Sequence, residues 1–147
     1  MARFQLADFL PYQLSVAANA VSRVVADDTG YVTRFGLTGA EWRVLAVVTA
    51  AGKPTQAELI ALTGMDKMTI SRAVAPLCKR GLVDRVRDKD DRRTSRLSAS
   101  LPGIAIHDEI AAQAIEVETR LLAALSPADA ASLRRALSLL HRACTRP

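Results

Sequence analysis

The sequence is short of aromatic residues, of cysteines and of long apolar runs, and each shortage excludes a class of protein. Aromatic residues make up 4% of the 147 residues, and the two cysteines, Cys78 and Cys144, cannot build a disulfide framework. Every apolar run is far shorter than the roughly 20 residues that span a bilayer, and the first residues lack the apolar core of a signal peptide. Half of the residues are nevertheless apolar, which excludes intrinsic disorder. These features predict a single domain, residues 1–147, in the reducing cytoplasm.

Motifs that carry catalysis are missing as well. The chain has no Gly-x-Ser-x-Gly, phosphate-binding loop, Gly-x-Gly-x-x-Gly or His-Glu-x-x-His segment. The adjacent acids Asp90 and Asp91 stand among lysines and arginines that hold them ionised, which does not suit acid–base catalysis. His141 and Cys144 could share one helix face, but two ligands do not complete a structural zinc site. We therefore expect no enzyme, no cofactor and no metal.

Positive charge is concentrated in one stretch of the chain. From Lys67 to Arg96 there are ten lysines and arginines against four aspartates, a net charge of +6. The remaining 117 residues carry a net charge of −1, because the whole chain carries +5. A basic block in a nearly neutral chain is typical of a protein that binds a polyanion. A solvated surface loop would have the same composition, so charge alone leaves both interpretations open.

Apolar periodicity and capping residues predict six helices and one hairpin. The predicted helices cover residues 8–28, 39–50, 56–62, 66–80, 102–125 and 127–143. The segments 38–41 and 55–58 both fit capping boxes, in which a Thr and a Glu three residues later satisfy backbone N–H groups. Gly81 is placed to end the fourth helix. After it, the segments 82–87 and 94–99 flank a charged turn, which is the pattern of a β-hairpin.

The helices at the two ends carry apolar stripes. Phe9, Val16 and Val24 predict a buried stripe on the first helix, and Leu133 and Leu137 belong to a similar stripe on the last. One small domain offers few partners for these residues. Two copies of the chain could cover each other's stripes.

The middle of the chain predicts a helix-turn-helix, because two short helices are joined by a tight turn and the second helix is basic. An α-helix fits the major groove of DNA, about 12 Å wide, and its N-terminal side chains reach base edges. On the helix 66–80 the residues expected to face inward are Met68, Ala73, Val74 and Leu77. The predicted DNA contacts of this helix are Lys67, Thr69, Ile70, Ser71, Arg72 and Lys79. In the hairpin they are Lys89, Arg92, Arg93 and Arg96. Arg92 and Arg93 stand at the tip, from which they could reach a minor groove or flanking phosphates.

At these residues the chain resembles the MarR family of winged helix-turn-helix regulators. The resemblance runs from about Leu37 to Gly103, and the segment Asp90-Asp91-Arg92-Arg93 in the hairpin is its most specific part. Other matching segments are Glu41-Trp42-Arg43-Val44-Leu45, Thr55-Gln56-Ala57-Glu58-Leu59, Asp66-Lys67-Met68-Thr69-Ile70-Ser71-Arg72 and Lys79-Arg80-Gly81-Leu82-Val83. The resemblance implies a mainly α fold with a small β-hairpin. A winged helix-turn-helix lobe, residues 37–100, would be flanked by dimerisation helices in residues 1–36 and 101–147.

The resemblance also implies a function. Members of the family act as homodimers on pseudo-palindromic operators of double-stranded DNA, usually as repressors, and many are released by a small aromatic or phenolic ligand. An acid at the position of Asp91 is implied to brace a wing arginine, Arg93 or Arg92. A ligand-independent or architectural DNA-binding protein is the alternative, in which affinity would not depend on base sequence.

A ligand cleft is implied between the dimerisation helices and the DNA-binding lobe. By position, its candidate lining residues are Phe9, Leu10, Pro11, Tyr12, Trp42 and Arg43. For Trp42 and Phe9 a second interpretation is open, since aromatic residues at helical spacing are more often part of the core. Tyr12 is the better candidate, because a buried hydroxyl needs a hydrogen-bonding partner.

Overall fold

A computed structural model describes residues 4–91 and 93–145 of the chain. In order, its elements are a short 3-10 helix η1 (Leu6–Asp8), helices α1 (Leu10–Thr29), α2 (Gly39–Ala51), α3 (Gln56–Thr63) and α4 (Lys67–Lys79), strands β1 (Val83–Arg87) and β2 (Ser95–Ala99), and helices α5 (Leu101–Leu122) and α6 (Pro127–Thr145). The predicted mainly helical fold with one small hairpin is confirmed. None of the described helices is long and apolar enough to cross a membrane.

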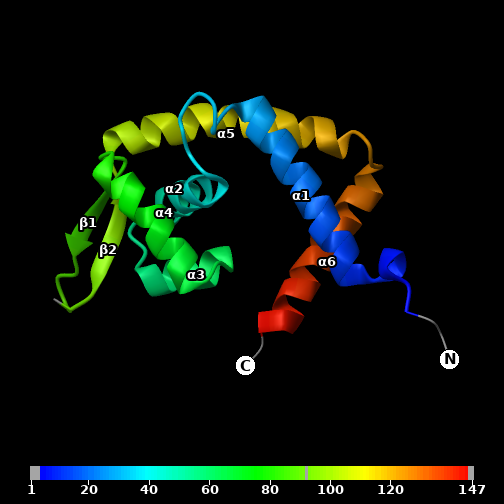
Figure 1. Ribbon diagram of the computed structural model, residues 1–147, viewed down its shortest axis with the longest axis horizontal. Coiled ribbons are helices and arrows are strands. Elements are labelled where there is room, and N and C mark those ends of the chain that lie inside the picture. The colour runs from blue at the N-terminus through cyan, green and yellow to red at the C-terminus, as the bar shows by residue number, and fades with distance from the viewer. Residues whose placement is uncertain (1–3, 92, 146–147) are drawn as a thin grey trace.

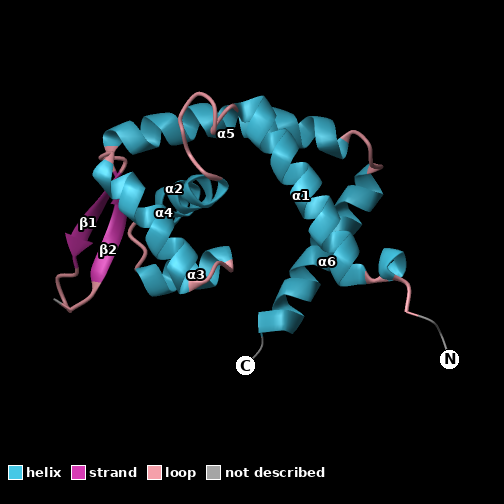
Figure 2. Cartoon of the chain, viewed as in Figure 1, coloured by secondary structure: helices cyan, strands magenta, loops and turns pink. Residues whose placement is uncertain are grey.

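Helix α5 connects two groups of elements (Figure 1). Helices α2, α3 and α4 gather beneath its first half, together with the β1–β2 hairpin (Figure 2). Helix α1 and helix α6 extend from the other half. The resulting arch sets the lobe formed by α2, α3, α4 and the hairpin apart from α1 and α6.

The core of the lobe is built from the apolar faces of α2 and α4. Val44, Leu45 and Val48 on α2 are fully buried. They pack against an apolar face of α4 that includes Ile70 and Leu77. Val74 on α4 is also fully buried, and the remaining fully buried large side chains of this cluster come from other segments of the lobe and from α5: Leu37, Leu59, Val83, Leu97 and Ile110.

Both predicted capping boxes are present. The Thr38 hydroxyl accepts a hydrogen bond from the Glu41 backbone N–H at the start of α2, and the Glu41 carboxylate accepts one from the Thr38 N–H. Thr55 and Glu58 do the same at the start of α3. Gly64 then has φ of +68°, which favours glycine and turns the chain sharply toward α4.

The terminal helices depart from the sequence prediction. The stripe predicted as buried on α1 is exposed within a single chain: Phe9 is 45% exposed and Val16 is 49% exposed, while Thr29 is the buried residue of α1. Helix α6 buries none of its described residues. Within the described part of a single chain, no element covers these faces, so periodicity predicted their amphipathic character but not their burial.

The hairpin is tied to the rest of the lobe by backbone contacts on both sides. β1 and β2 pair antiparallel, from Val83 opposite Ala99 to Arg87 opposite Ser95. On the other edge of β2, the Leu97 N–H donates to the Pro54 carbonyl oxygen at 2.9 Å. Gly103, in the first turn of α5, lies so close to the chain before β1 that an added Cβ would be 2.0 Å from the Leu82 carbonyl oxygen.

This close approach predicts that Gly103→Ala lowers the free energy of unfolding by about 3 kcal/mol, because a methyl group would overlap a backbone atom that cannot rotate away. Gly39→Ala is the matched control, since its added Cβ would meet only the Tyr31 hydroxyl at 3.4 Å, also from the first turn of a helix. Urea unfolding at one protein concentration measures both changes. Equal stability of the two variants would contradict the predicted overlap.

Candidate nucleic-acid interface

Helix α4 has one buried face and one outward face. Ile70, Ala73, Val74 and Leu77 follow the i, i+3, i+4, i+7 pattern and are all buried. The opposite stripe runs through Met68, Arg72, Ala75 and Lys79, which are exposed. The burial of the first stripe therefore determines which side chains α4 presents to a partner.

Two sequence-predicted roles on α4 change as a result. Ile70 was predicted to contact DNA, but its side chain is 0% exposed and belongs to the core. Met68 was expected to face inward, but it is 60% exposed. The prediction for Ile70 is wrong because the helical register that buries Val74 and Leu77 also buries Ile70.

The N-terminus of α4 is closed by its own capping residue. The Asp66 carboxylate accepts hydrogen bonds from the Thr69 backbone N–H at 2.8 Å and from the Thr69 hydroxyl at 2.9 Å. The first of these bonds is the main cause that lowers the pKa of Asp66 below its ordinary value of 3.8. Thr69 was predicted to contact DNA, yet its hydroxyl hydrogen is used within the helix. A carboxylate at this helix end also leaves no free positive end for a phosphate.

The other predicted residues of α4 lie at or beside the outward stripe. Lys67, Arg72 and Lys79 are exposed. Ser71 is half-buried beside the stripe, and its hydroxyl accepts a hydrogen bond from the Gln56 side chain at 3.3 Å. The sequence of α4 from Lys67 to Lys79 contains three basic residues and no acid, so its outward face is electrostatically suited to a polyanion.

The turn of the hairpin is organised around Asp88. One Asp88 carboxylate oxygen accepts hydrogen bonds from the backbone N–H groups of Asp90, at 2.8 Å, and Asp91, at 3.3 Å. The other forms an ion pair with the Arg96 guanidinium. The Asp90 N–H and then Arg96 lower the pKa of Asp88 below its ordinary value of 3.8. Their stabilisation is therefore fully present above that value, and it is lost as the pH falls through the lowered pKa.

Arg96 connects the hairpin to the helix-turn-helix. Its guanidinium donates to the Lys53 carbonyl oxygen at 3.0 Å and lies 3.6 Å from the carboxylate of Glu58. That same carboxylate caps α3 through the Thr55 N–H at 2.7 Å. Arg96 was predicted to contact DNA, but its guanidinium is bound on several sides within the chain. It is better described as the residue that holds the hairpin against α3.

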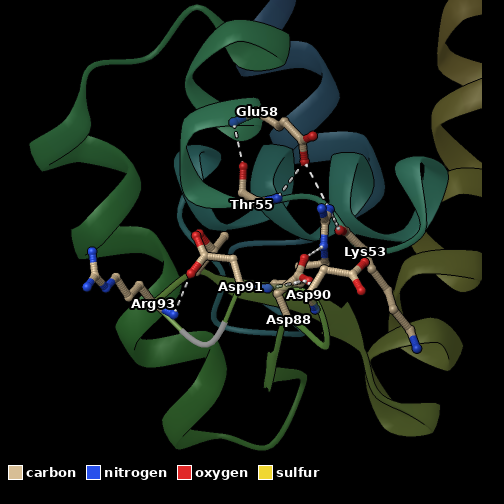
Figure 3. A network of polar contacts seen from close by, with 9 residues as sticks. Lys53, Thr55, Glu58, Asp88, Asp90, Asp91 and Arg93 are labelled. Atoms are coloured by element: carbon tan, nitrogen blue, oxygen red, sulfur yellow. Dashed lines mark hydrogen bonds and ion pairs between the residues drawn. The ribbon is translucent and has the colours of Figure 1, made fainter.

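Among the described residues, Asp91 orders the backbone of the hairpin turn. Its carboxylate accepts from the backbone N–H of Arg93 at 2.9 Å and from the Thr94 hydroxyl at 3.0 Å. The Arg93 side chain extends away from Asp91, so Asp91 orders the Arg93 backbone and does not orient the Arg93 guanidinium (Figure 3). Arg93 and Lys89 are exposed at the tip. Arg92, predicted to contact DNA and to be a partner of Asp91, lies outside the described residues.

The candidate ligand residues fall into two groups that one chain does not bring together. Phe9, Leu10, Pro11 and Tyr12 are exposed at the start of α1, far along the arch from the α2 residues Trp42 and Arg43 (Figure 1). Arg43 is exposed. A ligand cleft that uses both groups would need a second chain to join them.

Trp42 is engaged by rings of its own chain. Its ring stacks on Tyr31, with centroids 6.2 Å apart, and on His107 of α5, with centroids 5.7 Å apart. This aromatic stack joins the lobe to α5. Sequence reasoning missed it, because no spacing along the chain connects the loop after α1 with the middle of α5. Among the described residues, no group of three or more side chains is placed to hold a metal.

Comparisons with known proteins agree with this architecture. Residues 35–94 match the model of a protein family described as the MarR family. A comparison with proteins of curated function found no significant match.

Several solved structures are similar over nearly the whole chain. The chain is 34% identical to a probable transcriptional regulator from Pseudomonas aeruginosa, covering 92% of this chain and 99% of that one with a TM-score of 0.81. It is 30% identical to the MarR family transcriptional regulator SPO1453 from Silicibacter pomeroyi DSS-3, covering 94% and 99% with a TM-score of 0.77. It is 24% identical to the PcaV transcriptional regulator from Streptomyces coelicolor, solved in complex with its natural ligand, covering 98% and 99% with a TM-score of 0.83. At 24% identity, the similarity to PcaV shows a shared fold.

The contacts of Arg96 predict that Arg96→Ala loosens the hairpin while the helical core stays folded, because the side chain holds the hairpin turn and the capped end of α3 together. Hydrogen exchange of the backbone amides in β1 and β2 should become faster, whereas exchange in α2 and α4 should be unchanged. Lys89→Ala is the control, since it removes a nearby positive charge that is exposed. If hydrogen exchange in both strands of the Arg96 variant is unchanged, the assignment of Arg96 as the residue that holds the hairpin against α3 is contradicted.

Proposed function

We propose that this chain, which belongs to the MarR family of transcriptional regulators, binds a specific double-stranded DNA operator as a homodimer. Each subunit would place α4 in a major groove and the β1–β2 hairpin at the adjacent minor groove. The observation that carries the proposal is the outward stripe of α4, which is exposed and basic and lies beside a hairpin with a net positive charge.

The charge distribution supports both base contacts and phosphate contacts with DNA. Arg72 stands on the outward stripe near the start of α4, where a guanidinium can pair with the O6 and N7 atoms of a guanine. Lys79 lies two turns further along the same stripe, where a phosphate contact fits an ammonium group. The hairpin adds Lys89 and Arg93 at its exposed tip. A face that combines the fork-shaped donors of arginines with the point charges of lysines is suited to a sequence-specific contact.

The exposed apolar faces of the terminal helices support the homodimer. On α6, Leu133, Leu137 and Leu140 repeat at four- and three-residue steps and are exposed in a single chain, as are Phe9 and Val16 on α1. Monomeric proteins rarely leave such contiguous apolar surface in water. A two-fold dimer would cover both faces and would set two α4 helices on one DNA duplex. The half-sites would then be about one helical turn, or roughly 10 base pairs, apart.

Repression and release by a small aromatic ligand are the further parts of the proposal. A dimer of this size bound near a promoter would block access of the transcription machinery. The candidate ligand residues, from the start of α1 and from α2, would become one site only if the second chain brings them together. The fold shared with PcaV, whose structure holds a natural ligand, supports a search among small aromatic compounds.

If Arg72 reads a guanine, Arg72→Ala should cost about 1–3 kcal/mol of binding free energy and relax the base preference at one position of each half-site. Lys79→Ala should instead weaken binding to all sequences alike and reduce the salt dependence by about one phosphate contact. Gel-shift titrations on the DNA upstream of the chain's own gene and on a random duplex, at two salt concentrations, measure both effects. Equal affinity of the unsubstituted protein for every duplex would indicate an architectural protein instead.

The dimer predicts that Leu137→Asp produces monomers, because a carboxylate would enter an apolar interface without a partner. Ala131→Asp is the control, since Ala131 is exposed about 150° around α6 from the stripe of Leu133, Leu137 and Leu140 and receives the same charge. Sedimentation equilibrium gives the mass of each variant. A Leu137→Asp protein that remains dimeric at low micromolar concentration would contradict the assignment of α6 to the interface.

A further inference from the structure

We infer that Met68 is a specificity-determining residue that contacts the 5-methyl group of a thymine in each half-site of the operator. The inference rests on the proposed function, because it assumes that α4 lies in the major groove. It goes beyond that function by naming a base and the atom group by which the base is recognised.

The starting observation is that Met68 is exposed without a structural reason. Its side chain is 60% exposed, and it belongs neither to the buried core cluster nor to the apolar residues packed against that cluster. The inner face of α4 is already complete with Ile70, Val74 and Leu77. A large apolar side chain at this position therefore adds nothing to the described core.

The position of Met68 on the helix points to the floor of the groove. It is the second residue of α4, and the first turn of a recognition helix is the part that approaches base edges. It also shares the outward stripe with Arg72, one turn further along. A second protein is a poor candidate occupant, since the neighbours of Met68 along this stripe and at the helix start are Arg72 and Lys67, which favour a polyanion.

Among the groups that base pairs expose in the major groove, the 5-methyl group of thymine is the apolar one. A methionine side chain suits it, because the thioether is flexible and polarisable and can adjust to a methyl group. Met68 and Arg72 are four residues apart, or about 6 Å along the helix axis. At about 3.4 Å per base-pair step, the thymine should lie within about two base pairs of the guanine that Arg72 contacts.

The test begins with the full-length protein and a pool of random duplexes, from which bound sequences are selected. Each thymine of the selected half-site is then replaced in turn by deoxyuridine, which removes the methyl group and keeps every hydrogen-bonding atom. At one position per half-site, this change should weaken binding by about fourfold, the effect of one buried carbon. Met68→Ala should bind the thymine and deoxyuridine duplexes equally, while Met68→Leu should keep part of the difference.

One control variant and the unsubstituted protein separate the outcomes. Lys79→Ala, on the same stripe, should keep the full fourfold sensitivity to deoxyuridine. If Met68→Ala keeps it too, another residue or the DNA shape recognises the thymine, and the inference is overturned while the proposed function stands. If the unsubstituted protein selects a motif in which no deoxyuridine replacement matters, the inference is also overturned. If it selects no motif at all, the proposed function fails, and this inference fails with it.

Discussion

The packing of α4 against α2 is the contact on which the rest of the lobe depends. Ile70, Val74 and Leu77 are fully buried in it, and burying each such side chain is worth about 1.5–3 kcal/mol. A rotation of α4 by one residue would expose part of this stripe, so the register of the helix is fixed. Since the inner face cannot turn, the outer face cannot turn either. The direction of Met68 and Arg72 is thus set by residues that never meet a ligand.

The hairpin depends on a different kind of interaction. Its tip lies beyond the core, where no apolar contact can hold it, and polar contacts take over that role. Asp88 orders the turn, and Arg96 connects the turn to Lys53 and to the capped end of α3. One carboxylate, that of Glu58, serves both the helix cap and this connection. The start of the helix-turn-helix and the position of the hairpin are therefore coupled through a single side chain.

The parts of this structure that sequence reasoning predicted are the local ones. Thr38 and Thr55 with their glutamates predicted where α2 and α3 begin, and Gly81 predicted where α4 ends. The error at Ile70 was avoidable, because the i, i+3, i+4, i+7 pattern through Ala73, Val74 and Leu77 includes it. The role of Arg96 was not predictable, since its partners at 53, 58 and 88 meet only after the hairpin has folded against α3. The exposure of the α1 and α6 stripes depends on what one chain can cover, which periodicity does not measure.

Helix α5 has a mechanical consequence for the whole molecule. Its 22 residues run from the hairpin to the terminal helices as one continuous element, about 33 Å long at 1.5 Å per residue. Gly103 holds one end against the hairpin, and the aromatic stack of Trp42 with His107 adds a second attachment to the lobe. Such a helix acts as a lever. A tilt of about 10° at the terminal end would move the far end by about 6 Å, which exceeds the rise of one base-pair step, about 3.4 Å.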